Sequence, residues 1–148
     1  MEQPTTDTTT QLRLERHYHA SPEAVFAALT EPALLARWFA PTDEMEAVID
    51  RFEARVDAPY RIEMHAPSGD VHVAIGEIRE VVPNERLVYT WKWEGGEMGD
   101  TLVTWTLEAS ESGTVLRLLH DQFPDEEARD RHLVGWNGCL ARLQPLLV

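Results

Sequence analysis

The hydrophobic residues of this chain recur with two periods, and each change of period marks a boundary between predicted elements. Apolar and polar residues alternate in QLRLERHYHA (residues 11–20), which predicts a first strand. Alternation returns after residue 44, interrupted by turn sequences such as PSGD, PNE and the glycine-rich EGGEMG. The strands predicted there span residues 44–52, 54–66, 71–82, 86–93, 100–109 and 114–123. This pattern predicts several antiparallel strands in succession, each with one apolar face.

Two short helices are predicted between the first two strands. In SPEAVFAAL, Ser21 is suited to the N-cap position and Pro22 to the first helical position. TEPALLARWF repeats the arrangement, with Thr30 as the expected N-cap and Pro32 just inside the helix. Pro41 is expected to mark the end of this second helix.

A longer helix is predicted near the C-terminus, opened by Pro124 and the acidic residues at 125–127. Apolar residues then recur at steps of three and four, a helical period: Leu133, Trp136, Leu140, Leu143 and Leu147. Pro145 is expected to end the regular helix. Gly135 and Gly138 flank Trp136 although each costs about 1 kcal/mol against alanine in a helix. They indicate either close helix–sheet contact or space left open beside the helix.

Length and composition predict one globular domain over residues 11–148, preceded by a disordered polar tail at residues 1–10. The formal net charge is −13 and no basic patch is visible, which argues against nucleic acid and anionic membranes as partners. Residues 1–11 lack the features of a secretory signal, and no apolar run approaches the roughly 20 residues of a membrane span. With a single cysteine, Cys139, the chain forms no internal disulfide, and we expect a cytoplasmic location.

Four segments together narrow the fold: SPEAVFAALTEPALLARWFAP, GEIREVVPNERLVYTWKW, GTVLRLLHDQF and HLVGWNGCLARL. In order and spacing they resemble the Hsp90-ATPase-activator-like family of the START/Bet v 1-like superfamily, over roughly Leu12 to Leu147. The resemblance implies an α+β helix-grip fold: a seven-stranded antiparallel sheet curved around a long C-terminal helix, with two short helices closing one end. In one departure, Asp57-Ala58-Pro59-Tyr60 stands where members often carry a glycine pair before the third strand's aromatic residue. The chain must therefore make that bend differently.

Side chains on the apolar strand faces and on the last helix are predicted to line the space between sheet and helix. An ordinary filled core is one interpretation, and a ligand-binding groove beneath the helix is the other. On the second interpretation the ligand-binding residues are Trp38, Tyr60, Ile62, Met64, Tyr89, Trp91, Trp105, Leu118, His120, Phe123, Trp136 and Leu140. Among them only His120 is titratable near neutral pH, and it would orient the polar end of a ligand.

The sequence offers no catalytic constellation, and we expect no cofactor and no metal. His17 and His19 share a strand face, and His65 and His72 are expected opposite each other across the PSGD turn, but a zinc site needs three or four converging ligands. Cys139 lies beside the apolar helix stripe without a cationic neighbourhood, as expected of a small core residue.

Three functions remain open. The favoured one is binding of a small hydrophobic, aromatic or lipid-like molecule between the curved sheet and the C-terminal helix. The alternative is an Hsp90-activator-like interaction protein that contacts a chaperone through its surface. The third is a cyclase- or hydrolase-type enzyme using the same cavity, which needs at least two polar groups inside it. Glu63 or Asp121 would join His120 there only if the strand parity shifts by one residue.

Overall fold

The computed structural model describes residues 10–147, so the polar tail expected at residues 1–10 lies outside the described residues except for Thr10. The elements follow in the order β1 (Leu12–Tyr18), α1 (Pro22–Thr30), α2 (Pro32–Trp38), β2 (Glu46–Arg51), β3 (Pro59–His65), β4 (Val71–Val82), β5 (Arg86–Trp93), β6 (Thr101–Ser110), β7 (Gly113–Asp121), α3 (Glu126–Leu143) and the 3-10 helix η2 (Gln144–Leu147). Every strand and helix predicted from the periodicity is present.

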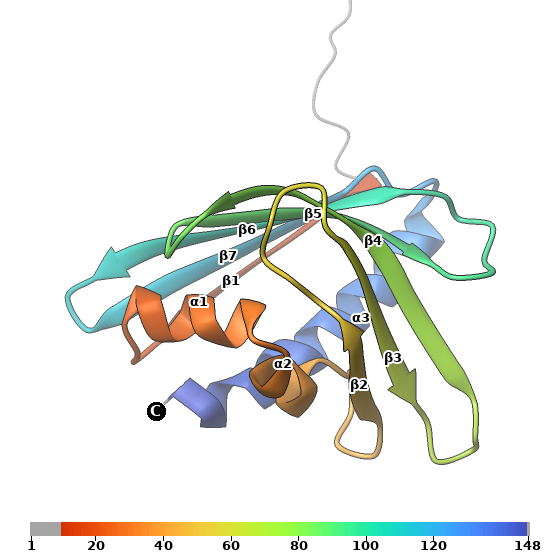
Figure 1. Cartoon of the computed structure of the whole chain (residues 1–148), viewed down its shortest axis with the longest axis horizontal. Coiled ribbons are helices and arrows are strands. Elements are labelled where there is room, and N and C mark those ends of the chain that lie inside the picture. Colours follow the sequence, from red (N-terminus) through yellow and green to blue (C-terminus); the bar gives the residue numbers. More distant parts are fainter. Residues whose placement is uncertain (1–9, 148) are drawn as a thin grey trace, which may run out of the picture.

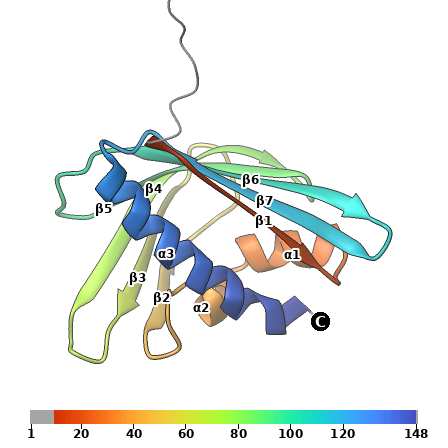
Figure 2. The ribbon, with the colours of Figure 1, turned by 180° about the vertical axis from the view of Figure 1, so that it is seen from behind.

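The seven strands form one sheet in the order β1-β7-β6-β5-β4-β3-β2, with antiparallel neighbours throughout. Strands β2 to β7 follow one another as a meander, and β1 completes the far edge beside β7. The sheet is bent, and α3 crosses its concave side while α1 and α2 lie near the C-terminal end of α3 (Figure 1, and from behind in Figure 2). This is the α+β helix-grip architecture that the sequence predicts.

The predicted parity of the strands is correct. Leu87, Trp105 and Leu118 lie directly opposite one another on β5, β6 and β7, and all three are buried. Together with the buried residues of α3 they fill the middle of the molecule with apolar side chains. The concave face of the sheet therefore supplies the core, as alternation along the strands requires.

The bend before β3 is made without the glycine pair expected from the family. Asp57 takes a left-handed conformation with φ of 71°, which aspartate tolerates better than most residues. Its backbone N–H donates to the Ile78 carbonyl (2.8 Å), and the Ile78 N–H donates to the carbonyl of the fully buried Ala58 (2.9 Å). The segment is thus tied to β4 by backbone hydrogen bonds on both sides.

One predicted cap is wrong. Ser21 caps α1 as expected, since its hydroxyl accepts a hydrogen bond from the Ala24 N–H (3.2 Å). Thr30, however, is the last residue of α1, and its hydroxyl donates to the Phe26 carbonyl (2.8 Å). Glu31 is the N-cap of α2 and makes no side-chain capping bond. Because one residue alone separates the two helices, Thr30 completes the first of them and cannot cap the second.

The two glycines of α3 have different roles. A Cβ atom on Gly138 would lie 2.0 Å from the Pro41 carbonyl oxygen, so the absence of a side chain lets α3 approach the chain that follows α2. A Cβ atom on Gly135 would meet nothing within 4 Å. Both of the alternatives raised by the sequence are therefore realised, close contact at Gly138 and open space at Gly135.

Substituting each glycine by alanine tests this difference. Gly138→Ala should destabilise the fold by about 1–3 kcal/mol, because the backbone at Pro41 must move. Gly135→Ala should stabilise it by about 0.5–1 kcal/mol, the usual helix-propensity gain, because nothing obstructs the methyl group. Urea unfolding of the two variants measures both changes, and changes of the same sign would contradict the described geometry.

Candidate ligand pocket

An open pocket of about 560 Å³ lies between α3 and the β3–β5 part of the sheet. Its walls come from the segment after α2, from strands β3 to β5, from the β5–β6 loop and from one side of α3. The lining residues are Phe39, Pro41, Met45, Met64, His72, Trp91, Trp93, Met98, Arg131, His132, Gly135, Trp136 and Cys139. The unobstructed side of Gly135 is part of this wall, so the glycine leaves room in the pocket.

Three of the twelve residues predicted to bind a ligand line this pocket: Met64, Trp91 and Trp136. The other nine are buried in the core and do not line it: Trp38, Tyr60, Ile62, Tyr89, Trp105, Leu118, His120, Phe123 and Leu140. Their inward orientation was correctly predicted, but in the structure they pack against one another.

Aromatic rings form the floor of the pocket. The Trp91 ring lies 5.4 Å from that of Trp136 and 5.9 Å from that of Phe39, measured between centroids, and all three side chains are buried. On its other side Trp91 meets Trp93 in an edge-on arrangement at 5.3 Å, and Trp93 is half-buried. These distances are typical of favourable aromatic pairs. The floor is therefore aromatic and apolar, and Trp93 lies between it and the rim.

Two buried histidines hold the indole N–H groups of this floor. The Trp136 indole donates to Nδ1 of His120 (2.9 Å), while Nε2 of His120 lies 2.7 Å from the Thr101 hydroxyl, which itself donates to the Trp91 carbonyl (2.7 Å). Nδ1 of His120 is thus an acceptor and Nε2 carries the proton. His120 is a fully satisfied core residue with no nitrogen left for a ligand.

His132 repeats this role with the opposite tautomer. Its Nε2 accepts from the Trp91 indole (3.2 Å), and its Nδ1 lies 2.8 Å from the Ala128 carbonyl, one helical turn earlier, so Nδ1 carries the proton. The two imidazole rings lie 5.2 Å apart and both are buried. Burial lowers the pKa of His120 well below its usual value, with His132 adding to the effect. Burial also lowers the pKa of His132, and the charge of Arg131 acts in the same direction.

The apolar periodicity of the helix did not indicate His132, because the predicted stripe begins at Leu133, which is only half-buried. The buried positions of α3 and η2 are Ala128, His132, Trp136, Cys139, Leu140, Leu143 and Leu147. Steps of four from Ala128 to Trp136 would have revealed this face if alanine and histidine had been counted as inward residues. Met45 and Met98 carry no such signal, because they lie outside the regular strands and are brought to the pocket by loop geometry.

Burial raises the pKa of the Cys139 thiol to about 12, so the pocket contains a thiol and no thiolate near neutral pH. In the described part of the chain, no group of three or more histidine, cysteine or acidic residues could hold a metal ion. The expected pairing of His65 with His72 is off by one residue, since His65 lies opposite Val71 and His72 lies opposite Met64. The two histidines consequently lie on opposite faces of the sheet.

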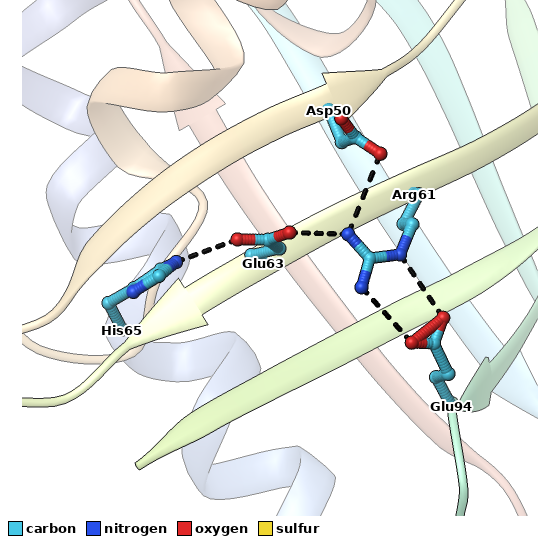
Figure 3. Close-up of polar contacts among 5 residues, drawn as sticks. All are labelled: Asp50, Arg61, Glu63, His65 and Glu94. Carbon is cyan, nitrogen blue, oxygen red and sulfur yellow. Dashed lines mark hydrogen bonds and ion pairs between the residues drawn. The ribbon is translucent and has the colours of Figure 1, made fainter. Parts of the chain in front are cut away.

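Glu63, which an enzyme would need inside the cavity, lies on the outer face. Figure 3 shows it between Arg61 and His65, whose Nε2 lies 2.8 Å from a Glu63 oxygen, while Arg61 also forms a two-pronged ion pair with Glu94 (3.0 and 3.1 Å). The hydrogen bond to His65 lowers the pKa of Glu63 most, and the hydrogen bond to Arg61 lowers it further. Asp121 does not line the pocket either, and burial raises the pKa of its carboxyl. The strand parity has not shifted, and neither carboxylate approaches the pocket.

Comparison with known proteins gives a family and a set of similar folds. The family model for Activator of Hsp90 ATPase homolog 1-like proteins matches residues 19–147. A crystal structure from Chromobacterium violaceum is 31% identical with a TM-score of 0.87, covering 93% of this chain and 96% of that one. A crystal structure from Rhodobacter sphaeroides is 30% identical with a TM-score of 0.82, covering 98% of this chain and 96% of that one. The crystal structure of the AHSA1 protein of Silicibacter pomeroyi is 28% identical with a TM-score of 0.82, covering 91% of this chain and 95% of that one. The comparison with curated proteins gave no match.

Within the described residues, no helix has the length and hydropathy to cross a bilayer.

The two buried histidines make stability depend on pH. Well above pH 6.5, the pKa of an unperturbed histidine, both are neutral in the folded and the unfolded chain and contribute no pH dependence. Below it the unfolded chain takes up protons that the folded chain resists, because protonation would displace the Trp91 and Trp136 donors. The free energy of unfolding should therefore fall between about pH 6.5 and pH 5, by up to about 1.4 kcal/mol per pH unit for each histidine.

Urea unfolding across this range measures how steeply the free energy of unfolding changes with pH. His132→Gln retains an acceptor for Trp91 and should reduce this slope by up to about 1.4 kcal/mol per pH unit, the contribution of one histidine. A flat profile, or an unchanged slope in the variant, would contradict the neutral assignment.

Proposed function

Because the chain belongs to the family of Activator of Hsp90 ATPase homolog 1-like proteins, in which the helix-grip fold is shared, we propose that it binds a small hydrophobic or aromatic molecule in the pocket beside α3. The observation that carries the proposal is the character of the lining. Three indoles, one phenyl ring and three thioethers surround a volume in the range of small-molecule sites. Methionine side chains are flexible and polarisable, so Met45, Met64 and Met98 can adapt to ligands of differing shape.

The polar groups nearest the floor are occupied within the protein. The indole N–H groups of Trp91 and Trp136 donate to His132 and His120. The floor of the pocket therefore presents aromatic rings and methionine sulfur, and neither of these two indoles has a donor left for a ligand. Affinity would come mainly from apolar area removed from water, at about 25 cal/mol per Å² before ordering costs. An apolar ligand is favoured at such a floor, because a polar one would lose hydrogen bonds to water without replacement.

A fluorescent, uncharged probe tests this function. N-phenylnaphthylamine, which brightens in apolar surroundings, should bind with one site per chain and quench the tryptophans of the floor. Gly135→Leu places a side chain into open space within the pocket and should weaken binding at least about tenfold without loss of stability.

The matched control is Val134→Leu, which adds bulk one position away on the exposed side of α3, where Val134 is 74% exposed. This variant should bind the probe like the parent chain. Absence of probe binding by the parent chain, or equal binding by Gly135→Leu, would contradict the proposal.

A further inference from the structure

The polar side chains at the rim of the pocket differ from those at its floor. Of the described contacts, none uses the indole N–H of Trp93 or a ring nitrogen of His72. Among residues 10–147, Arg131 has one polar side-chain contact, 3.5 Å to Glu127 one turn earlier, and both side chains are mostly exposed at 70% and 79%. The side chains of Trp93 and His72 therefore have no described hydrogen-bond partner and Arg131 has a long contact with Glu127, whereas the indole donors of Trp91 and Trp136 at the floor are satisfied.

The three residues belong to one edge of the pocket. His72 on β4 and Trp93 on β5 have ring centroids 6.3 Å apart, and Trp93 lies 5.6 Å from the ring of His132. Arg131 on α3 lines the same pocket, so polar groups from two strands and from the helix border it.

Arg131 gives the rim of the pocket a positive charge, although the chain as a whole carries −13. Arg131 is the one permanently charged residue among the described lining residues, and no carboxylate lines the pocket. Asp43, in the connection after α2, is paired with Arg142 (3.2 Å), and Glu127 holds Arg131 only at long range. A carboxylate on a ligand could therefore replace the weak Glu127 contact with a two-pronged one, which a guanidinium favours.

We propose, building on the function proposed above, that the ligand is an amphiphilic carboxylic acid whose apolar body lies on Trp91 and Trp136 and whose carboxylate meets Arg131 at the rim. The Trp93 N–H and the His72 ring line the same pocket and are available for further polar contacts with the ligand. The proposal concerns the class of ligand: an aryl or alkyl acid is bound in preference to the matching neutral amide or amine.

Competition against N-phenylnaphthylamine tests the preference with three compounds on one ring system: naphthylacetate, naphthylacetamide and naphthylethylamine. The acid should bind about three- to tenfold more tightly than the amide, and the amine most weakly. Raising the salt concentration should narrow the difference between acid and amide, because the rim is exposed.

Arg131→Gln should abolish the preference for the acid and leave the affinity for the amide unchanged. Arg37→Gln is the matched control, since it makes the same change in net charge at an exposed position of α2 that does not line the pocket. It should retain the preference, and thermal unfolding of both variants verifies that they fold.

The carboxylate proposal would be overturned if the acid binds no better than its amide, or if the two arginine variants change the preference equally. Binding of the uncharged probe by the parent chain would still support the proposed function of the pocket. Failure of the parent chain to bind the uncharged probe would overturn both.

Discussion

The hydrogen bond from the Trp136 indole to Nδ1 of His120 fixes the place where the terminal helix meets the sheet. Both side chains are buried, and His120 is bonded in turn through Thr101 to the backbone of β5. Losing one partner of such a bond leaves a buried polar atom unsatisfied, which costs about 1–3 kcal/mol. The bond requires a neutral His120 with an unprotonated Nδ1. Burial of the imidazole favours this neutral form, and the position of α3 depends on it. The Trp91–His132 bond adds a second point of attachment on the same face of α3.

With the helix attached at these points, the glycines determine how closely each part of it approaches its surroundings. At Gly138 the helix backbone lies against the Pro41 carbonyl, and any side chain there would separate them. One turn earlier, at Gly135, the helix faces open space, and the bent strands β3 to β5 with their loops form the opposite wall. A pocket follows from a helix that is held tightly at one place beside a sheet that curves away from it.

Most of the fold was predictable from the sequence because it depends on periodicity. The alternation in β5 and β6 placed Tyr89, Trp91 and Trp105 on the concave face, and all three are buried there. The boundary between core and pocket was not predictable. The alternation along a strand shows which face of the sheet a side chain occupies, but it does not show where along that face the side chains are covered by others and where they border a pocket. Trp105 and Trp91 share that parity, yet one is enclosed and the other forms the floor. Met45 and Met98 reach the pocket from irregular segments, where no periodic signal exists.

The indole N–H resonances of the five tryptophans report most directly on whether ligands enter at this place. Trp91, Trp93 and Trp136 line the pocket, whereas Trp38 and Trp105 lie in the core, bonded to the Ala28 carbonyl and the Tyr89 hydroxyl. In a nitrogen–proton correlation experiment with N-phenylnaphthylamine, the account predicts the largest shifts at the three pocket indoles and small shifts at the other two. Shifts that are largest at Trp38 and Trp105, with Trp93 unmoved, would contradict it.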